Sequence, residues 1–555
     1  MLVKYGKEKR CIIVLFYDRE GIVDTYFLEL LNELRPETNN LIVVCNGWVN
    51  PDSFSKLEEY TDEVILRVNQ GFDVGAYREI LFYLGWKTLS TFEEVILLNY
   101  TFFVMKNSFH KMFETMDQRD IDFWGITKHH KMPNDPYGDV YPWGYMPEHL
   151  NSHFIALRNS LFTSWAYRNF IFNLPNPSSR QESVVKYETI FTKTFSDFGY
   201  VYDTYTDSNF LEGIHYFPGV YGIDRLLEKK NCPIIKRRVF YTDYLEYIDK
   251  TAGEASAYAY EWLKRHPEEF DMNSMWDNIL RLENLADITQ TLHLRFFPDS
   301  LTTEHEFSDE EALIVVHGPK ILFDLFYVSY EKNIPAKWEW LYVEGSLSDA
   351  LKQAGMSCGK YSYVFFINLL DPKEWEPYSN GTSLIYRDME NLCGSSELIG
   401  NLVEEFIQNE RLGMLVPPLP NHGIYYEKVQ DGRAGYDEKL QKVCQKLGLR
   451  VQVRKSAAPP VYSWTGSFWI RSKLLIQIME TYDISGIEDS VVHMLMPLLL
   501  QEMGYFTGVV MSTQYASLEA TNLGYMMREV NRALFERVGP DYYWKELNKL
   551  EETIK

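Results

Sequence analysis

Residues 68–81, VNQGFDVGAYREIL, place a carboxylate, Asp73, between two glycines at a point where a helix is expected to begin. Gly71 and Gly75 allow backbone conformations and close approaches that other residues resist. The first turn of a helix has free N–H groups and a favourable dipole, so an anion such as a phosphate can bind there. The same pattern fits a tight strand-to-helix turn in which Asp73 caps the helix. The stretch alone leaves both interpretations open.

The elements that position this stretch follow from hydrophobic patterning. Residues 11–17, CIIVLFY, form a continuous apolar run, which is typical of a strand buried on both faces. Apolar residues then recur at helical spacing over residues 22–34. Further strands are expected at LIVVCNG, EVILRV and EEVILLNY, with helices between them, which predicts a parallel α/β sheet. Ligands bind at the carboxyl ends of such strands. The loops expected there are Tyr17-Asp18, Asn46-Gly47, 69–76 and 99–101.

Length and composition limit the class of protein. With 555 residues and roughly 100–200 residues per domain, three or four packing units are expected. A hydrophobic share of 46% and an aromatic share of 15% describe a globular protein. The net charge of −23 argues against a general nucleic-acid or anionic-membrane surface, although an anionic ligand can bind in a locally basic pocket.

Cysteine usage and the apolar runs predict a cytoplasmic protein. The six cysteines are scattered, without a CxxC pair or the spacing of metal ligands, which fits a reducing compartment. The N-terminus lacks the apolar core of a signal peptide, and no apolar run approaches the ~20 residues that span a bilayer.

The chain contains, in this order, FYDREGIVDTY, VVCNG, NQGFDVGAYREIL, DFWGIT, HLNSHFIALRNSLF, PIIKRRVF and MWDNILR. This succession resembles the rhamnan synthesis protein F family, bacterial glycosyltransferase-like proteins of cell-wall polysaccharide assembly. The resemblance runs over about residues 10–300, with a looser likeness beyond, and NxGFDxGAY is its most specific part. It implies a GT-A-like, Rossmann-like nucleotide-sugar-binding fold and transfer of L-rhamnose from a dTDP-linked donor.

Sugar transfer needs a general base for the acceptor hydroxyl, and Glu188 is the candidate. In YETIFTKTFSDFGY it opens a helix whose apolar face would hold Ile190, Phe191, Phe195 and Phe198. An acid at the start of such a helix is similar to the base-bearing helix of inverting GT-A enzymes. The alternative is that Glu188 only complements the helix dipole.

The position of a metal ligand departs from the pattern of the resembled family. That family tends to carry Asn-Asp-Ser/Thr after the fourth strand, whereas this chain has Asn99-Tyr100-Thr101. The hard carboxylate ligand for Mg²⁺ or Mn²⁺ is therefore missing. A divalent cation assisted by Asp73 or Asp18, a metal-independent site and a loss of activity all stay open.

Basic side chains could also stabilise a leaving diphosphate. IIKRRVF places Lys236 and Arg237 after an apolar pair, and Arg78 lies just inside the helix that follows Gly75. A run of charges is more often a solvated surface, so each is a candidate only. The resemblance further implies that Asn69, Asp73 and Arg78 contact the nucleotide. The predicted donor-binding residues are Tyr17, Asp18, Asn69, Gly71, Asp73, Gly75, Arg78, Asn99, Thr101, Lys236 and Arg237.

The aromatic-rich segment DVYPWGYMPEHLNSH is expected to be an acceptor-side loop, because Trp and Tyr stack on sugar rings. Its candidate contacts are Trp143, His149, Asn151 and His153. A merely packed loop is an equal alternative. A zinc site is not expected, because HLNSHF lacks the glutamate of a zincin motif and residues four apart on a strand chelate poorly.

The second half partly repeats the first. TGSFWIRSKLL is similar to NSHFIALRNSL, LGMLVPP to FWGIT, and IEDSVVHMLMPLLLQEMGYF to the Glu188 helix. No counterpart of NxGFDxGAY occurs there. We expect a GT-A-like domain at 1–240, a helical connector at 241–300 and a second, divergent domain at 301–555. Glu488, Asp489 and His493 could form a second catalytic set or its remnant.

The leading hypothesis is an inverting glycosyltransferase that adds L-rhamnose to a growing lipid-linked cell-wall polysaccharide. Its partners would be a nucleotide-sugar donor and a polysaccharide or lipid-linked glycan acceptor, with no nucleic acid. Any association with the inner face of the membrane would be peripheral, although no strongly basic amphipathic helix that could anchor the chain is evident. The alternatives are a non-catalytic glycan-binding or scaffolding subunit of the assembly complex and a transferase for a different sugar.

Overall fold

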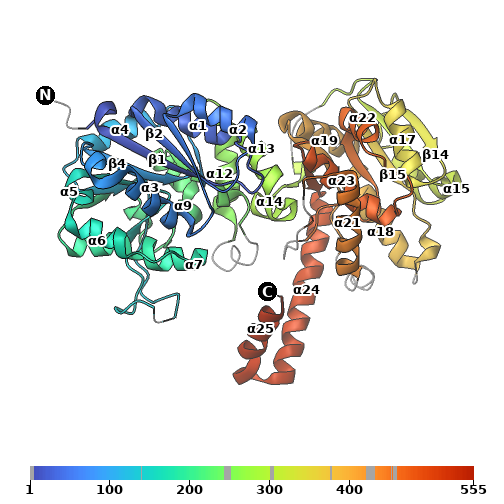
Figure 1. Cartoon of the computed structure of the whole chain (residues 1–555). Coiled ribbons are helices and arrows are strands. Elements are labelled where there is room, and N and C mark those ends of the chain that lie inside the picture. The colour runs from blue at the N-terminus through green and yellow to red at the C-terminus, as the bar shows by residue number, and fades with distance from the viewer. Residues whose placement is uncertain are drawn as a thin grey trace. The chain divides into compact units, whose positions relative to one another are not determined.

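The computed structural model describes residues 5–138, 140–242, 252–300, 305–375, 378–420, 432–451, 453 and 459–554. They divide into two compact units, the first ending at Asn278 and the second beginning at Ile279 (Figure 1). Each unit is built around its own seven-stranded sheet.

The sheet of the first unit has the order β10-β6-β9-β4-β1-β2-β3. β1, β2, β3 and β4 are parallel, whereas β9 runs antiparallel to both of its neighbours. Two small antiparallel pairs, β5 with β11 and β7 with β8, accompany it. The strands are β1 Arg10–Phe16, β2 Asn40–Asn46, β3 Glu63–Arg67, β4 Glu94–Asn99, β5 Phe102–Val104, β6 Phe123–Gly125, β7 Lys128–His129, β8 His149–Leu150, β9 Phe154–Arg158, β10 Tyr202–Thr204 and β11 Ile234–Lys236.

Helices follow most strands, as a parallel sheet requires. Every residue of β1 is buried, and alternate side chains of this strand face opposite sides of the sheet. On one side, Ile13 and Leu15 pack in a cluster with Tyr77, Ile80 and Phe191. The helices are α1 Thr25–Leu34, α2 Pro51–Tyr60, α3 Phe72–Leu89, α4 Phe109–Asp117, α5 Asn159–Phe162, α6 Trp165–Asn173, α7 Arg180–Ser183, α8 Thr189–Asp197, α9 Pro218–Tyr221, α10 Ile223–Lys230, α12 Glu254–Lys264 and α13 Met272–Leu282.

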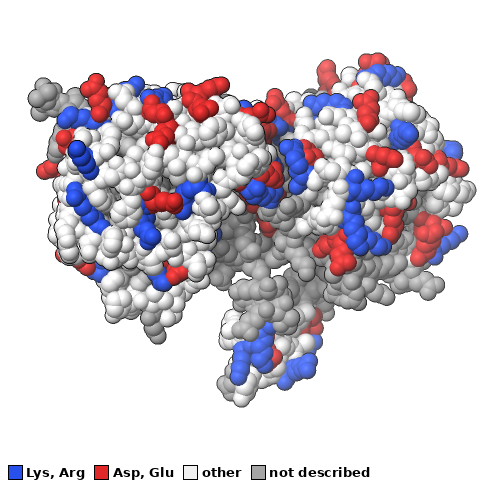
Figure 2. Space-filling model, viewed as in Figure 1, with Lys and Arg blue, Asp and Glu red and all other residues white. Residues whose placement is uncertain are grey.

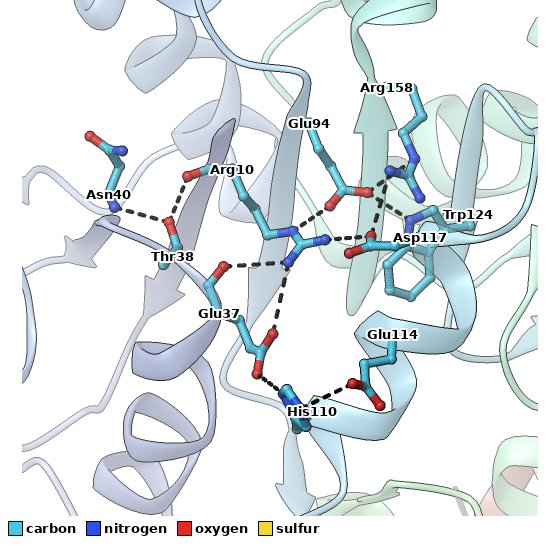
Figure 3. Close-up of polar contacts among 10 residues, drawn as sticks. All are labelled: Arg10, Glu37, Thr38, Asn40, Glu94, His110, Glu114, Asp117, Trp124 and Arg158. Carbon is cyan, nitrogen blue, oxygen red and sulfur yellow. Dashed lines mark hydrogen bonds and ion pairs between the residues drawn. The ribbon is translucent and has the colours of Figure 1, made fainter. Parts of the chain in front are cut away.

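A buried ion network closes the amino-terminal edge of this sheet (Figure 3). Arg10 begins β1, Glu94 begins β4 and Arg158 ends the antiparallel β9, so the three side chains meet at one edge. Glu94 accepts from Arg10 Nε at 2.5 Å and from Trp124 Nε1 at 2.9 Å, and lies 3.2 Å from Arg158 Nε. Arg10 Nη2 also donates to Asp117 at 2.6 Å. Burial by itself would raise the pKa of Glu94, but the two guanidinium charges outweigh it and hold the pKa below its ordinary value.

The second unit repeats the plan of the first. Its sheet has the order β12-β18-β16-β17-β15-β13-β14, in which β17 is antiparallel to β15 and β16. β13, β14, β15, β16, β17 and β18 therefore correspond to β1, β2, β4, β6, β9 and β10. Among the described residues this unit has no counterpart of β3 and adds β12 at the opposite edge. The strands are β12 Arg295–Phe296, β13 Ala312–His317, β14 Glu339–Val343, β15 Tyr363–Asn368, β16 Leu412–Val416, β17 Phe468–Arg471 and β18 Phe506–Val510.

The second unit ends in a pair of helices. α24 is long, and α25 folds back beside its final turns (Figure 1). The helices are α14 Leu285–Thr291, α15 Lys320–Leu322, α16 Val328–Glu331, α17 Leu347–Ser357, α18 Tyr378–Cys393, α19 Ser396–Gln408, α21 Gly432–Leu447, α22 Ser472–Thr481, α23 Asp489–Glu502, α24 Thr513–Val538 and α25 Pro540–Ile554.

The fold class predicted from the sequence is confirmed: the chain has two related α/β units with mainly parallel sheets. Of the predicted connector, residues 252–278 lie in the first unit and residues 279–300 in the second. Residues 243–251, and residues 301–304 at the predicted start of the second domain, lie outside the described part of the chain. The three-part division stays a prediction.

The distribution of surface charge is consistent with the net negative charge of the chain. Acidic and basic side chains are interspersed over the described part of the face drawn in Figure 2, without an extended basic area. Within the described ranges, no helix combines the length and apolarity that crossing a bilayer requires.

Candidate active site

Strand ends and the start of α3 meet at the carboxyl edge of the first sheet, here termed the carboxyl corner. β1 ends at Phe16, β2 at Asn46 and β4 at Asn99, while α3 begins directly after Gly71. The Asn46 amide donates to the Phe72 carbonyl at 3.2 Å, which ties β2 to the helix. The loops predicted to bind a donor therefore follow strands that end at the same edge of the sheet.

The two glycines of this corner make room for the chain itself. Gly71 has φ +73° and precedes the helix. A Cβ on Gly75 would lie 2.7 Å from the Gln70 carbonyl oxygen, and one on Gly71 would lie 3.3 Å from Asn176 Oδ1. The structure thus favours the tight-turn interpretation for both glycines. A contact between them and a donor stays a prediction.

Asp73 lies in the first turn of α3, while Gly71 holds the capping position. Its Oδ1 accepts from the Ser183 hydroxyl at 3.1 Å and from the Val74 N–H at 3.0 Å, and its Oδ2 accepts from the Asn99 amide at 3.5 Å. Burial, and then the charge of Glu188, raise the pKa of Asp73. The side chain nevertheless keeps partial solvent exposure.

Glu188 is the last residue of a π turn, η3 Val184–Glu188, that leads into α8. The Ser152 N–H donates to its Oε1 at 3.1 Å. Burial by itself would raise the pKa of Glu188, but the charge of Lys236, His149 and hydrogen bonds from Ser152 outweigh it and lower the pKa. A carboxylate that is ionised and partly exposed can accept a proton. The predicted apolar face of α8 is right for Phe191 and Phe195 but wrong for Phe198, which follows the helix and is 65% exposed.

Lys236 ends β11 and supplies the cation of the corner. Its Nζ lies 4.9 Å from the centre of the Phe217 ring. Burial lowers the pKa of Lys236 to about 8, although the charge of Glu188 acts in the opposite direction. The side chain is partly exposed. A bound anion would favour the protonated lysine, so this group is suited to a phosphate.

Two histidines stack beside Glu188. The rings of His129 and His149 lie 4.9 Å apart and nearly parallel, at 8°. Their Nδ1 atoms lie 2.7 Å from the His130 carbonyl and 2.8 Å from the Pro147 carbonyl, so each Nδ1 carries the proton. Burial, followed by the neighbouring ring, lowers the pKa of His129 to about 3, and burial lowers that of His149. The His129 ring is therefore neutral, and its Nε2 is an acceptor.

The other predicted acceptor contacts are packed inside the unit. Thr127 donates to Asn151 Oδ1 at 2.8 Å and lies 3.5 Å from His153 Nε2, and Asn151 and His153 are both buried. Trp143 stacks on Tyr141, with ring centres 5.9 Å apart. Because Asn151 and His153 are buried, they could influence an acceptor only by positioning the residues around them. The stacking of Trp143 fits the packed-loop alternative. Their acceptor roles stay a prediction.

The predicted donor residues separate into two groups. Asp73 and Lys236 interact electrostatically with each other and with the predicted base Glu188. The Asn99 amide donates to Asp73, and Asn99 Oδ1 accepts from the Thr101 hydroxyl at 2.7 Å. These five form the set on which a site can be built.

The remaining predicted donor residues have other partners. Arg78 donates to the carbonyl of Leu174, and Asn69 is exposed. Asp18 accepts from the Ile22 N–H at 3.0 Å and so holds its own turn. The last two predicted donor residues lie against aromatic rings: the Arg237 guanidinium is 5.3 Å from the Tyr26 ring and 5.9 Å from the Tyr100 ring, and Tyr17 is 6.2 Å from Tyr100.

The carboxyl corner offers little to a resident metal ion. Among the described residues, no three His, Cys, Asp or Glu side chains are grouped as metal ligands. Asp73 is the one carboxylate beside Asn99, and its raised pKa weakens it as a ligand. A Mg²⁺ or Mn²⁺ held mainly by phosphate oxygens of a nucleotide would be compatible with Asp73 as a single protein ligand.

Sequence reasoning missed Ser183, which binds Asp73, and the Ser152 N–H, which binds Glu188. Both are ordinary residues remote in sequence from their partners, so no local pattern identifies them. His129 was visible as part of an adjacent pair, but its stacking on His149 depends on the pairing of β7 with β8.

The second unit has an equivalent corner in which His493 replaces Glu188. Glu188 precedes the Gly199-Tyr200 pair by as many residues as His493 precedes Gly504-Tyr505, and each pair leads into an equivalent strand. Two residues before β9, Ser152 contacts Glu188. Two residues before β17, a Cβ on Gly466 would collide with the His493 ring.

The cavity beside the histidine of this second corner is lined mainly by apolar residues. Burial lowers the pKa of His493 to about 4, and its Nε2 is sealed from solvent without a hydrogen-bond partner among the described residues. The cavity beside it is lined by Leu347, Leu351, Val492 and Met496, among others. Glu488 and Asp489, the acids predicted beside it, are exposed, and Glu488 pairs with Lys439 at 2.9 Å.

A model of the family described as rhamnan synthesis protein F matches residues 41–334 and 344–489. The chain belongs to this family. Membership indicates a glycosyltransferase, as the sequence resemblance implied. Among curated proteins, none matches the chain.

Several solved structures resemble this member of the family. The mannosyltransferase Ktr4p from S. cerevisiae is 12% identical with a TM-score of 0.23, covering 33% of this chain and 63% of its own. Core-mannan synthase A from Aspergillus fumigatus, in an Mn/GDP form, is 11% identical with a TM-score of 0.21, covering 33% and 66%. The glycosyltransferase GlyE of Streptococcus pneumoniae TIGR4 is 10% identical with a TM-score of 0.26, covering 61% and 75%. The chain thus spans less than two thirds of the length of the yeast enzyme, and the family assignment rests on the family model.

Proposed function

We propose that the first unit is an inverting glycosyltransferase that moves L-rhamnose from a dTDP-linked donor to a lipid-linked cell-wall polysaccharide. The observation that carries the proposal is Glu188, an ionised and partly exposed carboxylate within electrostatic range of Lys236. Family membership supports the sugar and the acceptor class, while the GT-A-like donor site is inferred from the carboxyl corner.

In the proposed reaction, the acceptor hydroxyl oxygen attacks the anomeric carbon of the donor. The bond from that carbon to the diphosphate oxygen breaks, and the bonding electrons leave with the diphosphate. Glu188 takes the proton of the attacking hydroxyl, and attack opposite the leaving group inverts the anomeric centre. Lys236 stabilises the negative charge that develops on the diphosphate.

The neighbours of these two groups keep them in the required state. The charge of Lys236 and the Ser152 N–H favour the ionised, unprotonated form of Glu188. The Asp73 carboxyl, held by Ser183 and Asn99, lies within electrostatic range of both Glu188 and Lys236 and would face the donor. If a cation accompanies the nucleotide, it would supply further charge stabilisation at the diphosphate.

The test compares Glu188→Gln with Asp197→Asn, a matched change at the far end of α8 that removes an exposed carboxylate paired with Lys193. Glu188→Gln should lower the rate of transfer from dTDP-rhamnose by roughly 10²–10⁴-fold while donor binding, measured by calorimetry, is kept. Asp197→Asn should leave the rate within about twofold, as surface changes usually do. Equal rates for wild type and Glu188→Gln, or no donor binding by the wild type, would contradict the proposal.

A second candidate is a non-catalytic glycan-binding or scaffolding subunit. It is favoured by Asn99-Tyr100-Thr101, in which Tyr100 stands where the resembled family has an aspartate. In that case Glu188→Gln would leave polysaccharide assembly in cells unchanged. Transfer of a different sugar would appear as turnover with another nucleotide sugar and none with dTDP-rhamnose, and Glu188→Gln would still abolish it.

A further inference from the structure

α24 begins on the second unit and then leaves it. Ser512 caps the helix by accepting from the Tyr515 N–H at 3.0 Å, and the buried Tyr515 ring lies 6.4 Å from the Tyr386 ring of α18. No described residue of α24 after Tyr515 is buried. α25 covers only the end of the helix, where the Phe535 and Tyr543 rings lie 6.1 Å apart (Figure 1).

An apolar stripe runs along the part of α24 that nothing in the described chain covers. Ala520, Leu523, Met527 and Val530, here termed the α24 seam, are spaced 3, 4 and 3 residues apart. Leu523, Met527 and Val530 are 39%, 58% and 59% exposed. Leu534 extends the alternation by one more step of four. This alternation is the seven-residue a/d pattern of a helix that pairs with another helix.

Charged side chains of α24 lie off the seam, and Arg532 is paired within the helix. Arg532 contacts Glu529 at 2.7 Å and Glu536 at 2.8 Å. The seam is therefore bordered by side chains that leave it apolar, and water is an unfavourable neighbour for it.

The pattern selects a helix as the occupant of the seam. A helix that lies on an anionic lipid surface carries an excess of Lys and Arg on its polar face. Residues 513–555 contain seven acids and six bases, so the helical pair has almost no net charge. The seven-residue spacing suits a facing helix, whereas a bilayer surface imposes no such period.

Self-pairing is compatible with the charges of the chain. The whole chain carries −23, nearly all of it outside residues 513–555, so two copies repel least at this pair of helices. The positions that flank the seam are Glu519, Gly524, Met526 and Asn531, of which only one is charged. Two copies of α24 can thus face each other without rows of like charge.

We propose that the α24 seam binds the α24 seam of a second copy, so that the protein is a dimer joined by its C-terminal helices. This proposal does not depend on the proposed transfer reaction.

The test uses the full chain and measures its mass in solution by sedimentation over a range of concentrations. The wild type should dimerise. The double variant Met527→Glu and Val530→Glu places charge on the seam and should be monomeric at every concentration that gives a wild-type dimer. Tyr525→Glu is the matched control, because Tyr525 is 66% exposed on the same helix but faces away from the seam. It should dimerise within about threefold of the wild-type affinity, as expected for a change outside the contact.

A second measurement separates loss of pairing from loss of folding. All six natural cysteines are buried, so Leu523→Cys adds the one accessible thiol of the described chain. A short bis-maleimide should join two Leu523→Cys copies and should not join two Tyr525→Cys copies. A monomeric wild type, equal masses for the seam and control variants, or monomers that bind neutral phosphatidylcholine vesicles through the seam would each overturn the proposal.

Discussion

The two units share the same order of strands but differ at both edges of their sheets. At each edge, carboxylates of the first unit are replaced in the second unit by groups without a negative charge. At the carboxyl edge, the first unit has Glu188 with Lys236 and Asp73, all partly open to solvent. The second unit has a neutral His493 whose Nε2 is sealed, beside apolar residues. The first corner is suited to charged ligands, whereas the second is packed like a core.

The amino-terminal edges differ in the same way. In the first unit, Glu94 pairs across the sheet with Arg158 and is held by Arg10 as well. In the second unit, the equivalent Arg471 lies opposite Tyr363 and donates to the Leu412 carbonyl at 2.7 Å. The same fold thus places an arginine at the end of the antiparallel strand in both units. Its guanidinium binds buried carboxylates in the first unit and backbone carbonyls in the second. The sheet therefore determines the position of this arginine, whereas the surrounding sequence determines which groups bind it.

The largest expected effect is at the amino-terminal edge. Glu94→Gln leaves two buried guanidinium groups without their shared carboxylate, and should destabilise the first unit by about 3–5 kcal/mol. Tyr363→Phe, its counterpart, should cost the second unit only about 0.5–1.5 kcal/mol. Urea unfolding followed by hydrogen-exchange mass spectrometry reports each unit separately. Equal losses in both units would show that the two edges do not differ as described.

His493→Glu tests whether the second corner can hold the charge that the first one holds. An acid here has no lysine to offset its burial, so we expect a destabilisation of the second unit by about 2–4 kcal/mol and a strongly raised pKa for the new carboxyl. Transfer activity should not increase. His493→Gln, the uncharged control, should leave transfer within about twofold and cost less than about 1.5 kcal/mol. A gain of activity in His493→Glu would show a second latent site.

The residue beside His493 should tolerate substitution less well than the residue beside Glu188. Gly466 has φ +90° and no room for a Cβ beside His493, so Gly466→Ala should destabilise the second unit by about 1–3 kcal/mol. Ser152→Ala keeps the backbone N–H that donates to Glu188 and should change stability by less than about 1 kcal/mol. Thermal unfolding of both variants checks the contrast, which fails if Gly466→Ala is the milder change.

The smallest effect concerns pH. With a pKa of about 8, Lys236 loses its proton as the pH rises through that value, so affinity for an anionic donor should fall by up to about tenfold between pH 7.5 and 9. Below this range the lysine is charged and the affinity should level off. Lys236→Met should bind more weakly at pH 7 and lose this pH dependence. Calorimetric titration with dTDP checks both, and an unchanged slope in Lys236→Met would assign the effect to another group.

The sequence predicts the strands well, because each parallel strand is a continuous apolar run that periodicity reveals. It also predicts the repeat through NSHFIALRNSL and TGSFWIRSKLL, since the arginine that ends each strand has the same place in both sheets. It predicts Glu188 from its place before a helix, but not Ser183 or Ser152, which reach the site from other segments.

Two misjudgements have physical causes. α3 begins at Phe72, earlier than the apolar pattern indicates, because Asp73 and Gly75 in its first turn interrupt that pattern. In the second unit, the sequence suggests Glu488, Asp489 and His493 together; the position equivalent to Glu188 belongs to His493, whereas the two acids are exposed. A change from carboxylate to imidazole hides the equivalence until the strands on either side are aligned.

The π turn before α8 has a consequence for how two segments of the site are kept in phase. In a regular α-helix, residues five apart point about 140° away from each other. A backbone bonded from i to i+5 brings them about one full turn apart, onto the same side. Ser183 and Glu188 are five apart across this turn, and both act on Asp73. The π turn therefore sets the angular register of the site: with the same residues in a regular α-helix, Ser183 and Glu188 would point about 140° apart, and only one of them could act on Asp73.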